Sequence, residues 1–307
     1  MTEQLIKKIA EKNNPTVVGL DPTLEMMPEA LRRRMFELYG KTPKAVAEMF
    51  IEFNTAIMDA VLDIVPAVKP QIAMYERYGL EGIRAYMETT RLAKEKGFVV
   101  IGDIKRGDIS STAEAYAAHL GGVDIDGERF DTWNEDIVTI APYLGSDGIT
   151  PFCKRLSDEN KGIFVLVVTS NPSSSELQCL ISDGKPIYEH MGALVEAWGE
   201  PYRSISGYSR VGAVVGATHP EQGALLRRLM PHTFFLLPGY GAQGATGKDI
   251  RGMFDKDGGG AIVNSSRGII AAYKKSARFG EDFALAAREA AIIMQKDLYE
   301  NVFGGRV

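Results

Sequence analysis

The sequence predicts an α/β fold, a single (β/α)8 barrel, and three observations support this prediction. Eight short apolar segments recur along the 307 residues and alternate with stretches of helical periodicity. The apolar segments are nearly continuous, which is typical of strands buried on both faces of a parallel sheet. Eight such units in about 300 residues match the length of a (β/α)8 barrel. A doubly wound parallel sheet is the alternative arrangement of the same elements.

The predicted elements follow in chain order. The strands are Thr16–Asp21, Ala67–Gln71, the start of Val99–Thr112, Asp136–Ala141, Ile163–Ser170, Val211–Thr218, Phe234–Gly239 and Ala261–Ser266. The helices are an amphipathic one within 2–13, then Lys44–Ile64, Leu80–Lys96, Thr112–Leu120, Ile149–Leu156, Tyr188–Trp198, Pro220–Leu229, Lys248–Phe254 and Phe283–Tyr299. The polar segment Gly121–Glu135 receives no element, and the Ser- and Gly-rich Pro172–Lys185 is predicted to be a long active-site loop.

The composition is balanced, with 45% hydrophobic and 24% charged residues and no linker-like stretch, so residues 1–307 are expected to form one domain. A net charge of −5 argues against a general nucleic-acid binder. No apolar run is long enough for a membrane span, and the first residues show no signal-peptide pattern. Cys153 and Cys179 lie far apart in the sequence, and such sparse cysteine usage leads us to expect a cytoplasmic protein. The two cysteines form no metal-type pair and the histidines show no ligand spacing, so we expect no metal site.

Polar residues fall repeatedly where the predicted strands end. In a (β/α)8 barrel the C-terminal ends of the strands carry the chemistry. Convergence of several such residues on one rim therefore favours an active site over a set of unrelated surface groups. The residues are Asp21, Lys69, Asp103, Lys105, Asp108, Thr169, Ser170, Asn171, Gln243, Ser266 and Arg267.

The stretch Val99–Thr112 (VVIGDIKRGDISST) carries the densest charge. Residues two apart on a strand share a face, so Asp103 and Lys105 should project together. The second strand neighbours the third in a barrel, which should bring Lys69 to the same pair. Mutual attraction then keeps every group charged, which favours Lys105 as a proton donor and disfavours it as a Schiff-base nucleophile. An ordinary ion pair at a strand end is the structural alternative.

A glycine-rich segment, Gly239–Gly244, follows the seventh strand and formally matches G-x-G-x-x-G. A dinucleotide site would want an acid at the end of the next strand, but that strand ends in Asn264-Ser-Ser-Arg267. Loops after strands seven and eight of a barrel commonly bind phosphate, and Gln243 and Arg267 can donate to it. The alternative is a flexible turn and a surface arginine. Ser170 either hydrogen-bonds a planar ligand or caps a loop.

Taken together, these segments resemble the orotidine 5′-phosphate decarboxylase family, in its longer bacterial form. The similarity runs from the first predicted strand to the eighth. The matching segments are GLDP at Gly19–Pro22, AVKPQ at Ala67–Gln71, GDIKRGDI at Gly102–Ile109, TSNPSS at Thr169–Ser174, PGYGAQG at Pro238–Gly244 and NSSRGI at Asn264–Ile269.

The resemblance implies decarboxylation of orotidine 5′-monophosphate to UMP, without metal or organic cofactor. It implies that Lys69, Asp103, Lys105 and Asp108 form the catalytic charge array. Lys105 would protonate C6 of the pyrimidine as carbon dioxide leaves, and Asp103 would crowd the substrate carboxylate.

The resemblance also implies the substrate-binding residues and the oligomeric state. The family is dimeric, and the residues that match Asp108 and Thr112 reach the partner's site. The implied contacts are ribose hydroxyls for Asp21 and Lys69, the pyrimidine for Ser170, the phosphate for Gln243 and Arg267, and loop closure over the ligand from Pro238 onward.

Two rival functions stay open at this point. Related decarboxylases and aldolases share D-x-K-x-x-D and bind magnesium through acids around it, but Ile101 and Gly102 precede Asp103 here. A non-catalytic nucleotide-binding protein would lack some of the charges, yet all four array positions are filled. The segments Gly121–Glu135 and Pro172–Lys185 depart from the family pattern, which leaves the contacts that cover the ligand open.

Overall fold

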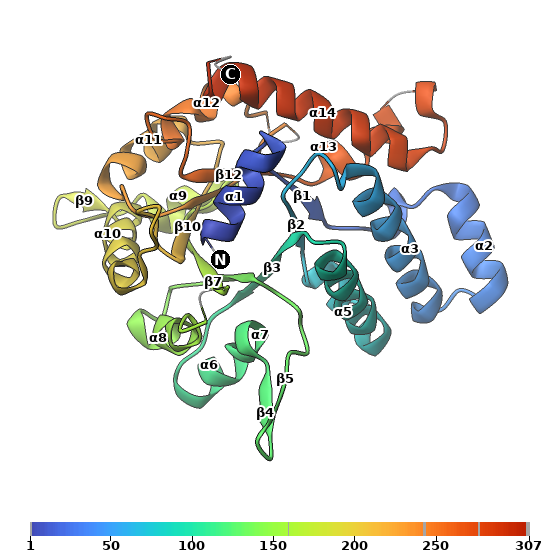
Figure 1. Cartoon of the computed structure of the whole chain (residues 1–307), viewed down its shortest axis with the longest axis horizontal. Helices are drawn as coiled ribbons and strands as arrows, with labels where there is room; N and C mark the ends of the chain where they lie inside the picture. The colour runs from blue at the N-terminus through green and yellow to red at the C-terminus, as the bar shows by residue number, and fades with distance from the viewer. Residues whose placement is uncertain (1, 159, 242–243, 276, 305–307) are drawn as a thin grey trace.

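The computed structural model describes residues 2–158, 160–241, 244–275 and 277–304. Eight parallel strands close into a barrel in the order β1-β12-β11-β10-β7-β6-β3-β2 (Figure 1), which confirms the predicted fold over a doubly wound sheet. The barrel strands are β1 (Thr16–Leu20), β2 (Ala67–Pro70), β3 (Val99–Arg106), β6 (Ile137–Ile140), β7 (Gly162–Val168), β10 (Val211–Val215), β11 (Phe235–Pro238) and β12 (Ala261–Ser265).

Helices surround the barrel, and short 3-10 turns connect several of them (Figure 1). The α-helices are α1 (Thr2–Lys12), α2 (Glu29–Tyr39), α3 (Pro43–Val61), α4 (Ala73–Glu76), α5 (Gly79–Glu95), α6 (Ser110–Tyr116), α7 (Ala118–Gly121), α8 (Ser146–Arg155), α9 (Ser175–Gln178), α10 (Ile187–Gly199), α11 (Pro220–Leu229), α12 (Gly247–Ile250), α13 (Arg267–Ile270) and α14 (Phe283–Val302). The 3-10 turns are η1 (Leu24–Met26), η2 (Pro172–Ser174), η3 (Glu200–Tyr202), η4 (Arg251–Met253), η5 (Ala272–Lys275) and η6 (Ala277–Phe279). Among the described helices, none combines the length and the apolar character that a bilayer crossing requires.

Two apolar clusters stabilise the barrel because strand side chains alternate between its inside and its outside. Val17, Ile101 and Phe164 belong to the inner cluster and are fully or almost fully buried. Leu5 of α1 joins this cluster at 0% exposure, and Figure 1 shows α1 lying across the barrel. The outer cluster packs the strands against the surrounding helices. The amphipathic pattern of the first helix thus serves to cover one end of the barrel.

The predicted strands run too far at their C-terminal ends. Asp21, Gln71, Ser170 and Ser266 all lie outside the strands that were predicted to contain them. These are polar residues at the rim, where the backbone leaves the ladder to form loops. The helix predicted at Thr112–Leu120 is divided into α6 and α7, and α2 was not predicted.

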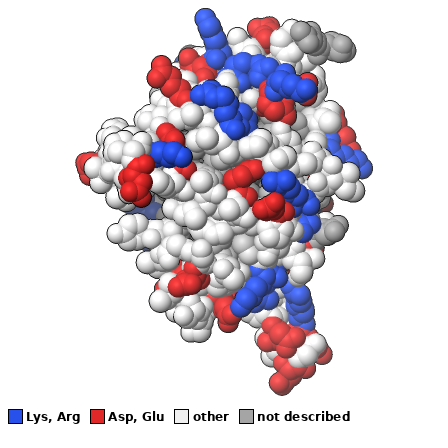
Figure 2. Space-filling model, turned by 90° about the vertical axis from the view of Figure 1, so that its left-hand side faces the viewer, with Lys and Arg blue, Asp and Glu red and all other residues white. Residues whose placement is uncertain are grey.

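Two segments predicted to lack elements contain β-hairpins. Strands β4 (Val123–Ile125) and β5 (Glu128–Phe130) lie within Gly121–Glu135. Strand β8 (Ile181–Ser182) lies within Pro172–Lys185, and its partner β9 (Lys185–Pro186) begins at the last residue of that segment. Each hairpin turns at an Asp-Gly pair with positive φ at both residues, which favours tight two-residue turns. The prediction of one long loop at Pro172–Lys185 was therefore wrong. The β4–β5 hairpin protrudes from the body, and acidic residues gather at the protruding tip in Figure 2.

Candidate active site

The end of β3 departs from regular strand geometry at the charged residues. Its residues are buried as far as Ile104, and Lys105 is exposed. Lys105 has a φ of +46°, in the left-handed region that non-glycine residues rarely occupy. Its Nζ nevertheless lies 2.5 Å from Asp103 Oδ1. The prediction that Asp103 and Lys105 project together is confirmed.

Lys69 of β2 continues this pair into a row of alternating charges. Its Nζ lies 2.7 Å from Asp103 Oδ2 and 3.9 Å from Asp21 Oδ1. The order along the row is therefore Lys105, Asp103, Lys69 and Asp21. Lys69 and Asp103 are 3% and 7% exposed, so solvent screens their attraction only weakly. The predicted approach of the first three strand ends is confirmed.

Burial and pairing act in opposite directions on the pKa values of this row. Burial lowers the pKa of Lys69, but attraction by Asp103 and Asp21 outweighs it, and the net pKa is raised. Burial raises the pKa of Asp103, but Lys69 and Lys105 outweigh it and hold that pKa far below the usual carboxyl range. The central pair is therefore ionised at neutral pH, as the sequence predicted.

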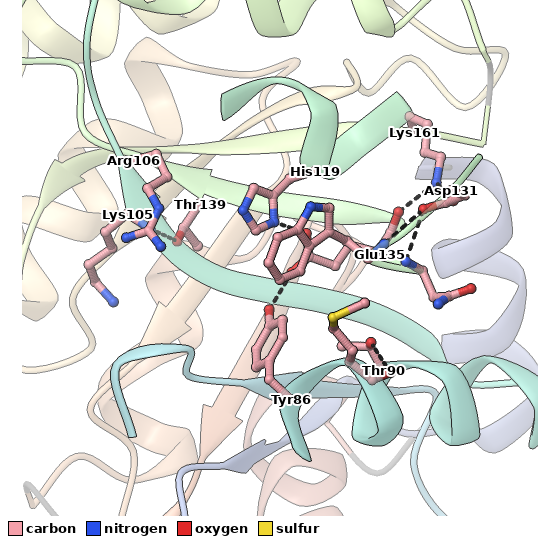
Figure 3. A network of polar contacts seen from close by, with 12 residues as sticks. Tyr86, Thr90, Lys105, Arg106, His119, Asp131, Glu135, Thr139 and Lys161 are labelled. Carbon is pink, nitrogen blue, oxygen red and sulfur yellow. Dashed lines mark hydrogen bonds and ion pairs between the residues drawn. The ribbon is translucent and has the colours of Figure 1, made fainter. Parts of the chain in front are cut away.

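Glu135 packs behind β3 at Gly102, the residue before Asp103. A Cβ at Gly102 would collide with the Glu135 carboxylate, so glycine permits this close approach. Glu135 Oε2 lies 2.8 Å from His119 Nδ1, and Oε1 accepts from the Tyr86 hydroxyl (Figure 3). Burial raises the pKa of Glu135 against the opposing effect of His119 and Tyr86. His119, one of the scattered histidines, thus pairs with a buried carboxylate behind β3.

The charge row lines a cavity of 530 Å³, a size suited to a small ligand. One wall carries the charges, and another carries the ends of β11 and β12. The lining residues are Asp21, Thr23, Met26, Lys69, Gln71, Met74, Asp103, Lys105, Pro238, Gly239, Tyr240, Asn264, Ser266 and Arg267.

A second cavity of 350 Å³ shares four of these residues and extends the site into the barrel mouth. Its deeper wall is apolar, and the residues after β7 form its other side. The shared residues are Lys69, Asp103, Lys105 and Pro238, and the additional ones are Thr139, Leu166, Thr169, Ser170, Asn171, Val214 and Leu236. Ser170 therefore borders the charge row, as its predicted contact with a planar ligand requires.

Arg267 lines the larger cavity from the start of α13, after β12, which pairs with β1. Gly239 and Gly241 have φ values of +108° and +70°, which glycine adopts at little cost, and they turn the chain away from β11. The predicted phosphate-binding residue Gln243 lies outside the described residues. Arg267 and the glycine-rich backbone can together receive an anion at this end.

Asp108 and Thr112 stand apart from the cavities within the described chain, and neither lines either one. Asp108 Oδ1 accepts a hydrogen bond of 2.8 Å from the backbone N–H of Ile109, and Thr112 is exposed on α6. One chain therefore assembles three members of the predicted catalytic array, together with Asp21. The role of the fourth stays a prediction.

Several lining residues were not among the predicted site residues. Tyr240 and Asn264 line the larger cavity and lie within two predicted site segments, Gly239–Gly244 and the end of the eighth strand. Their positions in the sequence could therefore have identified them. Thr139 carried none, because threonine is common within strands and DIVTIA has an ordinary strand pattern. Its hydroxyl nevertheless donates to Asp103 Oδ1 at 2.9 Å.

The donor set of the cavity fits an anionic organic ligand better than a metal ion. Lys69 lies between the carboxylates of Asp21 and Asp103 and contributes its own positive charge there. Across the described ranges, no group of three or more His, Cys, Asp or Glu residues could hold a metal ion.

Comparison with known proteins agrees with this geometry. A family model described as orotidine 5′-phosphate decarboxylase / HUMPS family matches residues 15–279. The chain is 44% identical over 288 residues to an orotidine 5′-phosphate decarboxylase of Rhodopirellula baltica, covering 94% of this chain and 92% of the relative. It is 40% identical over 304 residues to the Clostridium tetani protein of that name, covering 98% and 99%. The solved OMP decarboxylase of Leishmania donovani superposes with a TM-score of 0.70 at 30% identity, over 96% and 98% of the two chains.

Proposed function

The chain belongs to the orotidine 5′-phosphate decarboxylase / HUMPS family, and we propose that it converts orotidine 5′-monophosphate to UMP and carbon dioxide. One structural observation carries the proposal to this reaction. The row Lys105, Asp103, Lys69, Asp21 lines the same cavity as Arg267. This arrangement can hold a nucleotide phosphate at one end and place the reacting carbon beside an ammonium group.

Lys105 is the proposed proton donor. When the C6–carboxylate bond breaks, the electron pair stays at C6 and carbon dioxide departs. The Lys105 Nζ then transfers a proton to C6 and recovers one from water, to which its side chain is 45% exposed. Negative charge on C6 is stabilised by the ammonium groups of Lys105 and Lys69, which the row holds in place before the reaction begins.

Asp103 is proposed to press on the substrate carboxylate. Its pKa lies far below the usual range, so it stays ionised beside a second anion. That repulsion is present with the substrate and disappears as the carboxylate leaves as neutral carbon dioxide. The array therefore favours the transition state over the bound substrate.

The remaining contacts follow the same orientation of the nucleotide. We propose that Asp21 and Lys69 bind ribose hydroxyls, Ser170 binds the pyrimidine and Arg267 binds the phosphate. Gln243 is proposed as a second phosphate ligand. The loop that begins at Pro238 is proposed to close over the bound nucleotide. The reaction and the two free thiols, Cys153 and Cys179, fit a cytoplasmic protein.

A second copy of the chain is proposed to complete the site. Asp108 and Thr112 lie outside the cavities of their own chain, so their proposed role requires a partner. The apolar side chain of Ile109, which directly follows Asp108, is 47% exposed and supports an interface there. In a 1:1 mixture of Lys105→Ala and Asp108→Asn chains, shared sites would restore about a quarter of wild-type activity, since half the dimers carry one intact site. Two inactive chains that stay inactive when mixed would contradict the shared site.

Turnover by the purified protein tests the proposed reaction. The protein is treated with a chelator and mixed with orotidine 5′-monophosphate, and loss of the orotate chromophore is followed. We expect turnover that chelation does not reduce. Absence of turnover would contradict the proposal, and activity on a ketose phosphate that requires magnesium would favour the rival phosphosugar reaction.

A further inference from the structure

The ladder between β3 and β6 is interrupted where the catalytic charges lie. Gly102 pairs with Val138, and the next pair is Arg106 with Ile140. β3 therefore advances four residues while β6 advances two. Thr139 is the single β6 residue opposite the three β3 residues 103–105. A bulge of this kind removes regular ladder partners and redirects side chains.

The Thr139 hydroxyl bonds to both charged residues of the bulge. Its Oγ1 accepts a hydrogen bond of 3.0 Å from the backbone N–H of Lys105 and donates one of 2.9 Å to Asp103 Oδ1. A hydroxyl has a single proton to donate, so accepting from the amide leaves that proton for the carboxylate. Figure 3 shows Thr139 pointing to the Lys105 backbone from the neighbouring strand.

These two bonds fix groups that would otherwise have freedom to move. Lys105 occupies the left-handed region, which is unfavourable for a non-glycine residue and persists only where surrounding contacts hold it. Asp103 receives Lys69 on Oδ2 and both Lys105 and Thr139 on Oδ1. Removal of the hydroxyl would leave the buried carboxylate without its neutral donor and the Lys105 amide without this acceptor.

We propose that Thr139 is a positioning residue for the decarboxylation, and this inference rests on the proposed function. It sets the relative orientation of Asp103 and Lys105 without itself receiving or giving a proton in the reaction. Its role is to keep the carboxylate ionised and rigid while the ammonium group reaches the reacting carbon. Pre-organised charge of this kind acts on the transition state more than on binding.

Three variants separate the hydroxyl from the packing of this side chain. Thr139→Val keeps the shape and removes both hydrogen bonds, at a site that is 1% exposed. Thr139→Ser keeps the hydroxyl and loses one methyl group. The matched control is Thr16→Val on β1, because Thr16 is also fully buried on a barrel strand and its hydroxyl has no hydrogen-bond partner among the described residues.

The readouts are kcat for orotidine 5′-monophosphate, Kd for UMP and thermal unfolding. We expect kcat to fall about 10- to 100-fold in Thr139→Val, since hydrogen bonds to charged groups contribute at this level. Kd for UMP should change less than about threefold, because the hydroxyl orients the reacting groups. Thr139→Ser and Thr16→Val should keep kcat within about threefold of the wild type.

Three outcomes would overturn the inference: wild-type kcat in Thr139→Val, an equal loss in Thr139→Ser, or a parallel loss of kcat and UMP affinity. Absence of turnover by the wild-type protein would overturn the proposed function, and the proposed role of Thr139 in that reaction would be overturned as well. If Thr139→Val does not fold, Thr139→Cys replaces it, since a thiol hydrogen-bonds weakly. Loss of kcat in the cysteine variant but not in the serine variant would then support the hydroxyl.

Discussion

The buried attraction between Lys69 and Asp103 leads to a prediction about stability that does not depend on substrate. The changes are Lys69→Met and Asp103→Asn, alone and together. At 2.7 Å and an effective dielectric constant of about 20, the gross attraction is about 6 kcal/mol. Desolvation of two buried charges offsets much of it. Removal of one partner, however, leaves the other buried and poorly compensated, at a typical cost of 3–5 kcal/mol.

We take about 3 kcal/mol for each single variant, because each remaining charge keeps another partner. Asp103 keeps Lys105, and Lys69 keeps Asp21 at 3.9 Å. The double variant removes both charges and should be about as stable as either single variant. The predicted coupling free energy is therefore about 3 kcal/mol.

Guanidinium unfolding at pH 7, followed by far-UV circular dichroism, measures this coupling. The control cycle is Lys154→Met with Glu114→Gln, an exposed pair at 3.1 Å, for which about 0.5 kcal/mol or less is expected. The coupling of the buried pair should persist between about pH 4 and 10. The pKa of Lys69 is raised in the folded protein, so its contribution to stability is lost as the pH rises through that folded-state pKa. The pKa of Asp103 is lowered in the folded protein, so its contribution to stability is lost as the pH falls through that folded-state pKa. A coupling below about 0.5 kcal/mol would refute the electrostatic reasoning.

Three further predictions concern other parts of the molecule. Arg267→Ala should raise Kd for UMP at least tenfold with the fold intact, and unchanged affinity by calorimetry would argue against a phosphate contact. Burial raises the pKa of Cys153 to about 12, so iodoacetamide at pH 8 should leave it unmodified in the native protein, and mass spectrometry showing rapid alkylation would contradict its burial. Arg288 lowers the pKa of the exposed Asp63 to about 2, so Asp63→Asn should cost about 0.5 kcal/mol above pH 4 and nothing below pH 2. A cost for that variant that stays constant with pH would exclude this ion pair as its cause.

The charge row could be predicted from sequence because simple geometry governs it. Lys69 and Asp103 end adjacent parallel strands, and parallel strands place their C-terminal ends on one rim. The glycine-rich turn after β11 and Arg267 after β12 converge for the same reason. This reasoning needs only strand order and strand ends, and a periodic sequence supplies both.

The bulge at Lys105 could not be predicted in this way. Its positive φ and the bonds of Thr139 depend on a register shift between β3 and β6, which no periodic pattern encodes. The two hairpins, unlike the bulge, had a signal in the sequence, since their turns at Asp126 and Asp183 are Asp-Gly pairs. They were not predicted because the residues around these turns are polar and show no strand pattern. The proposed role of Asp108 requires a second chain, and the strand pattern of a single chain carries no information about contacts between chains.

Product analysis of Lys105→Ala beside the wild type tests the central claim most directly. Both proteins are mixed with orotidine 5′-monophosphate, UMP and carbon dioxide are quantified, and Kd for UMP is measured on each. The account predicts that the wild type forms both products in equal amounts. It predicts that Lys105→Ala binds UMP within about tenfold of the wild type and loses at least about 10³-fold in kcat. Substantial turnover by Lys105→Ala, or none by the wild type, would contradict the claim that this charge row performs the decarboxylation.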